Sequence, residues 1–136
     1  MASTLTDPRG RAKAYRPMAP ELRAAALDEF VAAYAAAEFF EAHELLEPAW
    51  MGSPDPAERE LFQGLIKLAA AFVHAQRGNP AGIAKNLRGA RDRLAGAPKD
   101  EPRFDVPALI AAADERLARL ASGETDIEPI ALSRRP

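Results

Sequence analysis

The sequence predicts an all-α fold, a compact bundle of about five helices in which the third helix is central. Apolar residues recur at steps of three and four in several segments, and turn or capping residues separate these segments. No alternating β-branched run bounded by hairpin turns is present. The 136 residues suit one domain with one core. We therefore expect a helical domain at 20–123, a flexible arm at 1–19 and a loose tail at 124–136.

The first two helices differ in how clearly their ends are marked. The first begins at Pro20, a residue favoured in a first helical turn, and carries an apolar stripe that includes Leu27 and Phe30. The second covers about 39–50, but residues 34–38 between the two contain no helix breaker. Pro48 lacks a backbone donor, so we expect a kink or an early end there.

The last three helices have clear start and stop signals. Asp55 before Pro56 predicts the start of a helix over about 56–77, and Gly78 predicts its end. This helix is apolar on most faces, which places it at the centre of the bundle. Asn79 with Pro80 opens the fourth helix, which stops at 96–98. The fifth runs from about 105–107 to 123.

Composition narrows the classes of function. The formal net charge of -2 offers no general field for nucleic acid, so a nucleic-acid partner is disfavoured. The absence of cysteine excludes disulfides and thiolate metal sites. The longest apolar runs are too short to span a bilayer, so we expect a cytoplasmic protein without a membrane partner.

Polar residues fall on apolar faces of the two middle helices. On a helical wheel, His43 and Glu47 lie on the side of the second helix that carries Phe39, Phe40, Leu46 and Trp50, with Glu44 at its edge. The aromatic residues are interpreted as core. On the third helix a single polar line contains Glu60, Gln63, Lys67 and His74.

We expect these two polar lines to meet, because a buried charged group without a partner costs a few kcal/mol. The predicted cluster consists of His43, Glu44, Glu47, Gln63 and His74, with Glu41, Trp50 and Lys67 as accessory residues.

Three roles remain open for this cluster. It could be a hydrogen-bond network that fixes helix register in a structural or interaction module, which we prefer, with a protein partner or a second copy. It could bind a small ligand or a divalent metal such as zinc, iron or manganese through His43, Glu47 and His74. It could supply an acid and a base to a hydrolase-like enzyme. The segment 43–47, HELLE, lacks the second histidine of the metalloprotease motif.

The same residues carry a resemblance to a bacterial family, domain of unknown function 309. The family pattern F-x-E-A-H-E-x-x-E-x-x-W is matched from Phe39 to Trp50, and Q-G-L-I followed by A-A-A-x-x-H is matched from Gln63 to His74. The resemblance implies a compact all-helical domain with a central helix and no established activity. The chain departs from the family at 35–37, where the family usually has Gly or Asn; we still place the first turn there. It also departs at Pro48 and Lys67, where the family more often has a helix former and Gln.

Overall fold

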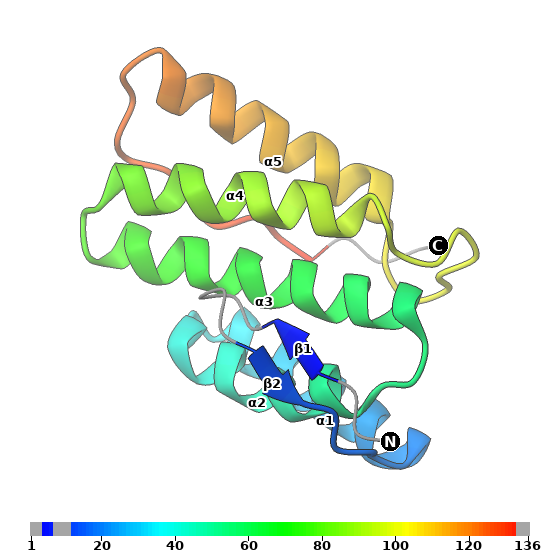
Figure 1. Cartoon of the computed structure of the whole chain (residues 1–136). Helices are drawn as coiled ribbons and strands as arrows, with labels where there is room; N and C mark the ends of the chain where they lie inside the picture. Colours follow the sequence, from blue (N-terminus) through cyan, green and yellow to red (C-terminus); the bar gives the residue numbers. More distant parts are fainter. Residues whose placement is uncertain (1–3, 7–11, 133–136) are drawn as a thin grey trace.

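The computed structural model describes residues 4–6 and 12–132, and it confirms the all-α prediction. Within these residues the helices are α1 (Pro20–Ala35), α2 (Phe39–Gly52), α3 (Pro56–Gln76), α4 (Pro80–Leu94) and α5 (Val106–Ala121). Each helix packs on the next one along the chain, and α3 packs most extensively against α4 and α2 (Figure 1). The third helix is therefore central, as predicted.

Side chains cap the starts of three helices, and the caps at Asp55 and Asn79 are as predicted. Asp55 accepts a hydrogen bond from the Ala57 amide at 3.0 Å, and Asp105 accepts one from Ala108 at 3.1 Å. The Asn79 side chain accepts from the Gly82 amide at 3.3 Å. Each bond satisfies an amide that the first turn leaves without a partner, so these signals locate the helix starts.

The flexible arm expected at 1–19 is described only at 4–6 and 12–19, and these residues contain structure that the sequence did not predict. Strands β1 (Thr4–Thr6) and β2 (Ala12–Ala14) pair antiparallel, with Thr4 opposite Ala14. After β2 the chain bonds to the end of α2, where the Arg16 amide donates to the Met51 carbonyl at 3.2 Å and the Met18 amide to Gly52 at 3.1 Å. A side chain at Gly52 would overlap Met18, so this close backbone approach requires glycine.

The break between α1 and α2 is a left-handed cap built on alanine. Ala37 has φ 60°, and the Glu38 amide reaches back to the Ala33 carbonyl at 2.9 Å. The same type of hydrogen bond, from an amide to the carbonyl five residues earlier, also ends α3 and α5. There the left-handed residue is a glycine, Gly78 or Gly123. The first turn, expected at 35–37 without an exact position, is thus an ordinary helix-ending motif with alanine in place of the usual glycine.

Aromatic packing explains why α1 ends where it does. The turn brings the Phe39 ring against Tyr34, with ring centroids 5.0 Å apart, and against Phe72 at 5.7 Å. The Gln76 amide nitrogen donates to the Ala37 carbonyl at 3.0 Å. Contacts with α3 therefore hold a turn that local propensity alone would run through as helix.

The C-terminal segment, residues 124–132, is packed, in contrast to the loose tail expected at 124–136. The last four residues of that expected tail lie outside the described part of the chain. Ile127 and Ile130 are buried, and the chain crosses behind α4 and α3 in the view of Figure 1. The Tyr34 hydroxyl donates to the Ile130 carbonyl at 2.6 Å, and the burial of this phenol raises its pKa well above the usual range. Arg116 donates to the carbonyls of Glu128 and Pro129.

Two further expectations concern α2 and the membrane. Helix α2 continues through Pro48 to Gly52, so Pro48 does not end it early. Among the helices of the described chain, none is both long and apolar enough to cross a bilayer.

Candidate functional site

An open groove of about 870 Å³ runs along three helices and contains four of the five predicted cluster residues. The residues of α2 that line it are Phe40, His43, Glu44, Glu47, Pro48 and Met51. The residues of α3, its C-terminal cap and α4 that line it are Ala70, Val73, His74, Arg77, Asn79, Ala81, Gly82, Lys85 and Asn86. Within each helix the spacing is mainly three and four, so one face of each helix forms the groove.

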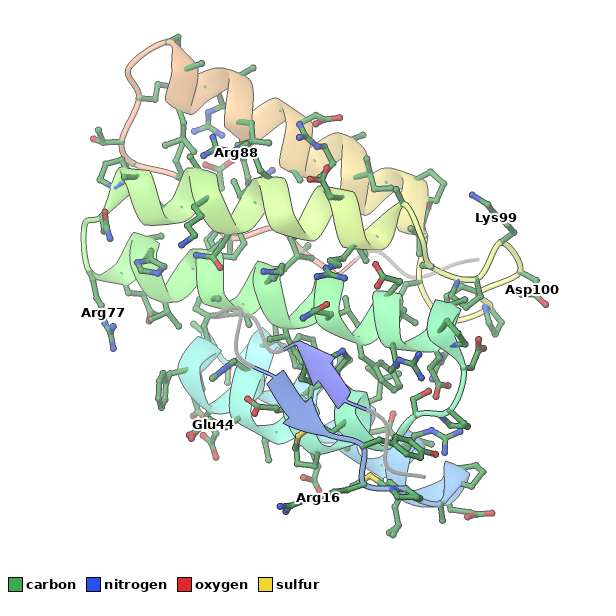
Figure 2. The ribbon with its side chains drawn as sticks, viewed as in Figure 1. Arg16, Glu44, Arg77, Arg88, Lys99 and Asp100 are labelled. Atoms are coloured by element: carbon green, nitrogen blue, oxygen red, sulfur yellow. The ribbon has the colours of Figure 1, made fainter. Side chains whose placement is uncertain are left out.

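The groove is open because most of its outer residues are exposed. Glu44, Arg77 and Lys85 are exposed, whereas His43 and His74 are half-buried. Figure 2 shows Glu44 and Arg77 at the same end of the molecule, projecting from α2 and from the end of α3. Charged side chains therefore surround a partly apolar surface, which includes Val73.

The buried face of α2 differs from the predicted one. Ala42 and Ala49 are fully buried, while Phe40 is 49% exposed at the groove. The interpretation of Phe40 as core is therefore wrong, whereas Phe39 and Trp50 are core residues. Small alanine side chains let α2 approach its neighbours closely, which a wheel weighted by large apolar residues does not capture.

His43 makes polar contacts with residues of its own helix, α2. Its Nδ1 is 3.3 Å from the Phe40 carbonyl, which can only accept, so the proton of this bond is on Nδ1. Its Nε2 is 3.7 Å from a carboxylate oxygen of Glu47, one turn along α2. This pair is an ion pair only when the imidazole is protonated. His43 and Glu47 therefore form a local pair on the α2 side of the groove.

The other imidazole is held by the start of α4. The Asn79 side-chain nitrogen is 3.1 Å from His74 Nδ1, and the Asn79 oxygen accepts from the Gly82 amide. Because the oxygen is engaged by a backbone donor, the nitrogen faces His74, and Nδ1 must accept. The neutral His74 ring therefore carries its proton on Nε2.

The polar line of α3 lies mainly against α4, which corrects the expectation that it meets the polar line of α2. A side chain added at Gly82 would overlap the His74 ring, and one added at Gly89 would come 2.8 Å from Lys67 Cδ. A side chain at Gly96 would come 3.1 Å from Glu60 Cγ. The three polar residues and the three glycines both repeat every seven positions. His74 and Lys67 therefore lie over glycines of antiparallel α4, and Glu60 lies over Gly96, two residues after α4 ends.

The remaining predicted residues lie outside the groove. Gln63 is in the interior and only 2% exposed. Trp50 belongs to the core, and Lys67 lies over Gly89. Glu41 is exposed, and the neighbouring Glu38 side chain raises its pKa. The structure therefore gathers His43, Glu44, Glu47 and His74 around one groove and separates Gln63 and the accessory residues from it.

The ligand set predicted for a metal is not assembled. Across residues 4–6 and 12–132, no three side chains of His, Cys, Asp or Glu lie close enough together to hold a metal ion. His43 and Glu47 are adjacent, but His74 is bound to Asn79. The groove thus presents hydrogen-bonding and charged groups, with His43 and Glu47 on the α2 side and His74 at the start of α4.

Comparison with known proteins identifies the region that contains the groove. The model of the family described as Domain of unknown function (DUF309) matches residues 27–86. The chain is similar to that family over this segment. Every described residue that lines the groove falls within the DUF309 segment, and Asn86 is the last residue of both. The resemblance predicted from the sequence is therefore confirmed.

A curated relative matches the same part of the chain. The uncharacterized protein YpuF of Bacillus subtilis (strain 168) is 39% identical over 61 residues, which is 45% of this chain and 34% of the relative. The chain therefore spans about a third of the length of this relative. No solved structure matches the chain.

Several groove residues in the DUF309 segment were missed by sequence reasoning. Arg77, Asn79, Lys85 and Asn86 were assigned no role in the site. Their position in the chain could have assigned them to the groove, because each lies within two turns of the α3–α4 connection and so near His74. The heptad spacing of the glycines was a second signal that identifies the face of α4 against α3.

Proposed function

We propose that the DUF309 segment is an interaction module that binds a segment of a partner protein in the α2–α3–α4 groove. The observation that carries the proposal is the groove, whose rim is charged and whose floor is partly apolar. Interfaces commonly combine an apolar centre with a polar rim. The groove therefore has the composition of a protein-binding surface.

The shape of the groove favours a macromolecular segment over an enclosed small molecule. Its volume of about 870 Å³ lies within the range of small-molecule sites, but such sites usually bury most of the ligand. Here Phe40 is half-exposed at the rim, and Pro48 and Ala81 are exposed. A ligand in this groove would keep one side in solvent, as a segment attached to a larger protein does.

The polar groups of the groove favour binding over chemistry. His43 is 3.7 Å from Glu47, beyond hydrogen-bonding distance, and His74 accepts from Asn79. The imidazole rings are thus held by separate partners, on α2 and at the start of α4. Fixed donors and acceptors of this kind orient a bound segment.

The proposal is tested by filling the groove. Ala81→Trp places a large side chain in it at an exposed position, and Ala111→Trp is a matched control at an exposed position on α5. Peptides selected by display on the parent should bind Ala81→Trp at least about tenfold more weakly and Ala111→Trp equally well. Circular dichroism checks that both variants fold. Equal binding to Ala81→Trp, or no peptide enriched at all, would reject the proposal.

A small ligand or divalent metal is the second candidate, because both imidazoles line the groove. A rise in melting temperature on adding zinc, iron or manganese that His43→Ala and His74→Ala both abolish would favour this candidate. A rise that survives both substitutions would come from another part of the protein. The two candidates are therefore separable with the same set of purified variants.

A further inference from the structure

We infer that the partner segment is an amphipathic α-helix of about three turns, with basic residues on one flank and acidic residues on the other. The inference rests on the proposed function and specifies its ligand. Three features of the groove lead to it: its length, the backbone chemistry of its walls and the distribution of its charges.

The length of the groove suits a short helix. The α2 side is lined from Phe40 to Met51, eleven residue steps of about 1.5 Å each, or about 16 Å. The α3 floor has Ala70 and Val73, and the α4 side has Ala81 and Gly82. Small side chains at the floor and wall allow a helix axis to approach to the usual packing distance of about 8–10 Å.

The walls offer little to an extended peptide. One recurring way to bind an extended segment is to pair its backbone with an open sheet edge, whereas all three sides of this groove are helices. The amides and carbonyls of a helix bond within that helix. Pro48 leaves the Glu44 carbonyl without its usual helical donor, but one such group does not form a ladder. A helix brings its own backbone bonds and therefore fits walls of this kind.

The charges differ between the two sides of the groove. Glu44 and Glu47 lie on the α2 side, and Lys85 lies on the α4 side. Arg77 extends from the end of α3. A helix with like charges on both flanks would be repelled by one wall, whereas opposite flanks are attracted by both. The apolar stripe between the flanks would then cover Val73 and contact Phe40.

The experiment uses display libraries of stapled helical peptides with a randomised apolar stripe. Staples are needed because isolated helices of this length are marginal in water. Three helical libraries differ in their flanks: one has Lys on one flank and Glu on the other, one has Lys on both, and one has Glu on both. A fourth library carries a central proline that prevents a helix. We expect the Lys and Glu library to be enriched most strongly on the full chain.

Charge reversals on the protein test which wall of the groove attracts which flank of the peptide. Glu44→Lys should weaken binding of the peptides selected from the library with one Lys flank and one Glu flank about fivefold, and should improve binding of the Glu-only library. Lys85→Glu should weaken the same peptides and favour the Lys-only library. Arg88→Glu is the matched control, because Arg88 is exposed on α4 outside the groove and lies toward α5 in Figure 2. It should leave binding unchanged.

Four results would overturn the inference. Equal enrichment of the three helical libraries would reject the charge pattern, and the strongest enrichment of the proline library would reject the helix. In both cases a peptide still binds in the groove, so the proposed function stands. Self-association that Ala81→Trp abolishes would make a second copy the occupant and reject the partner helix. No enrichment from any library would reject the proposed function as well.

Discussion

Ala37 adopts a backbone conformation that costs an L-residue about 1–2 kcal/mol relative to a right-handed one. Equivalent positions after α3 and α5 are Gly78 and Gly123, which adopt positive φ without this cost. The chain therefore retains alanine where its own structure elsewhere uses glycine. Contacts of Phe39 and Gln76 maintain the turn despite the cost.

Replacing Ala37 by glycine should stabilise the domain by about 0.5–1 kcal/mol. Relief of the left-handed strain outweighs the greater entropy of glycine in the unfolded chain. Urea denaturation measures the change in unfolding free energy. Ala36→Gly is the control, because Ala36 has φ -83° and should lose stability. A loss of stability in Ala37→Gly would show that the alanine carries no strain.

The proton of His74 should be on Nε2 in the neutral ring. Long-range nitrogen–proton NMR of the two histidines at pH 8 reads the tautomer directly. Asn79→Asp keeps an oxygen for the Gly82 amide but removes the donor to His74, so it should move the proton to Nδ1. The His43 signals should not change. A parent His74 already protonated on Nδ1 would contradict the assigned hydrogen bond.

At the scale of elements, the fit of α3 against α4 depends on glycine under a polar side chain. Alanine in place of glycine normally stabilises a helix interior by about 1 kcal/mol. At Gly82 the added methyl would overlap the His74 ring, and at Gly89 it would meet the flexible Lys67 stem. The two glycines should therefore respond differently to the same substitution.

Gly82→Ala should destabilise the domain by about 1–3 kcal/mol through overpacking, whereas Gly89→Ala should be close to neutral. In a His74→Ala background the Gly82→Ala change should be much less destabilising, because the ring is gone and the remaining close atom is the end of the Asn79 side chain. A double-mutant cycle in urea measures the coupling. Additive effects would mean that His74 and Gly82 do not contact, and the α3–α4 register would then be wrong.

Element boundaries were predictable where a capping side chain marked them, as at Asp55, Asn79 and Asp105. The end of α1 was not, because alanine carries no local signal for a left-handed turn. The face of α2 was also misjudged, since close packing buries Ala42 and leaves Phe40 half-exposed. Both errors arise from tertiary contacts that outweigh local preference.

At the scale of the molecule, the chain after α5 is held by ion pairs as well as by buried isoleucines. Arg119 contacts Glu115, Glu124 and Glu128, with the Glu128 contact at 2.7 Å. The Arg119 side chain lowers the pKa of Glu128 to about 2 from an ordinary value of 4.5. Because the folded pKa is lowered, the pair contributes stability above about pH 4.5 and loses it as the pH falls toward 2.

Glu128→Gln should therefore reduce stability at pH 6 and have a smaller effect at pH 3. The effect is modest because Glu128 is exposed, and added salt should decrease it further. Urea denaturation of parent and variant at both pH values gives the difference. Asp28→Asn, at an exposed position on α1, is the control. A difference that grows as the pH falls would contradict the lowered pKa.

The sequence predicted which part of the fold holds the candidate site but not how the residues of the site are paired. Four cluster residues, including His43 and His74, do line one groove. Their pairing was not predictable, because His74 binds Asn79 on the next connection and Gln63 turns inward. The packed C-terminal segment was hidden for a similar reason, since Ile127 and Ile130 are isolated apolar residues without helical periodicity.

The central claim is that the α2–α3–α4 groove is where the domain binds its partner. Backbone amide NMR of the labelled chain, titrated with a peptide enriched by display, tests this most directly. We expect chemical-shift changes concentrated at residues 40–51, 70–77 and 79–86, and absent in Ala81→Trp. Changes concentrated on α5 or the C-terminal segment, with the groove unaffected, would contradict the account.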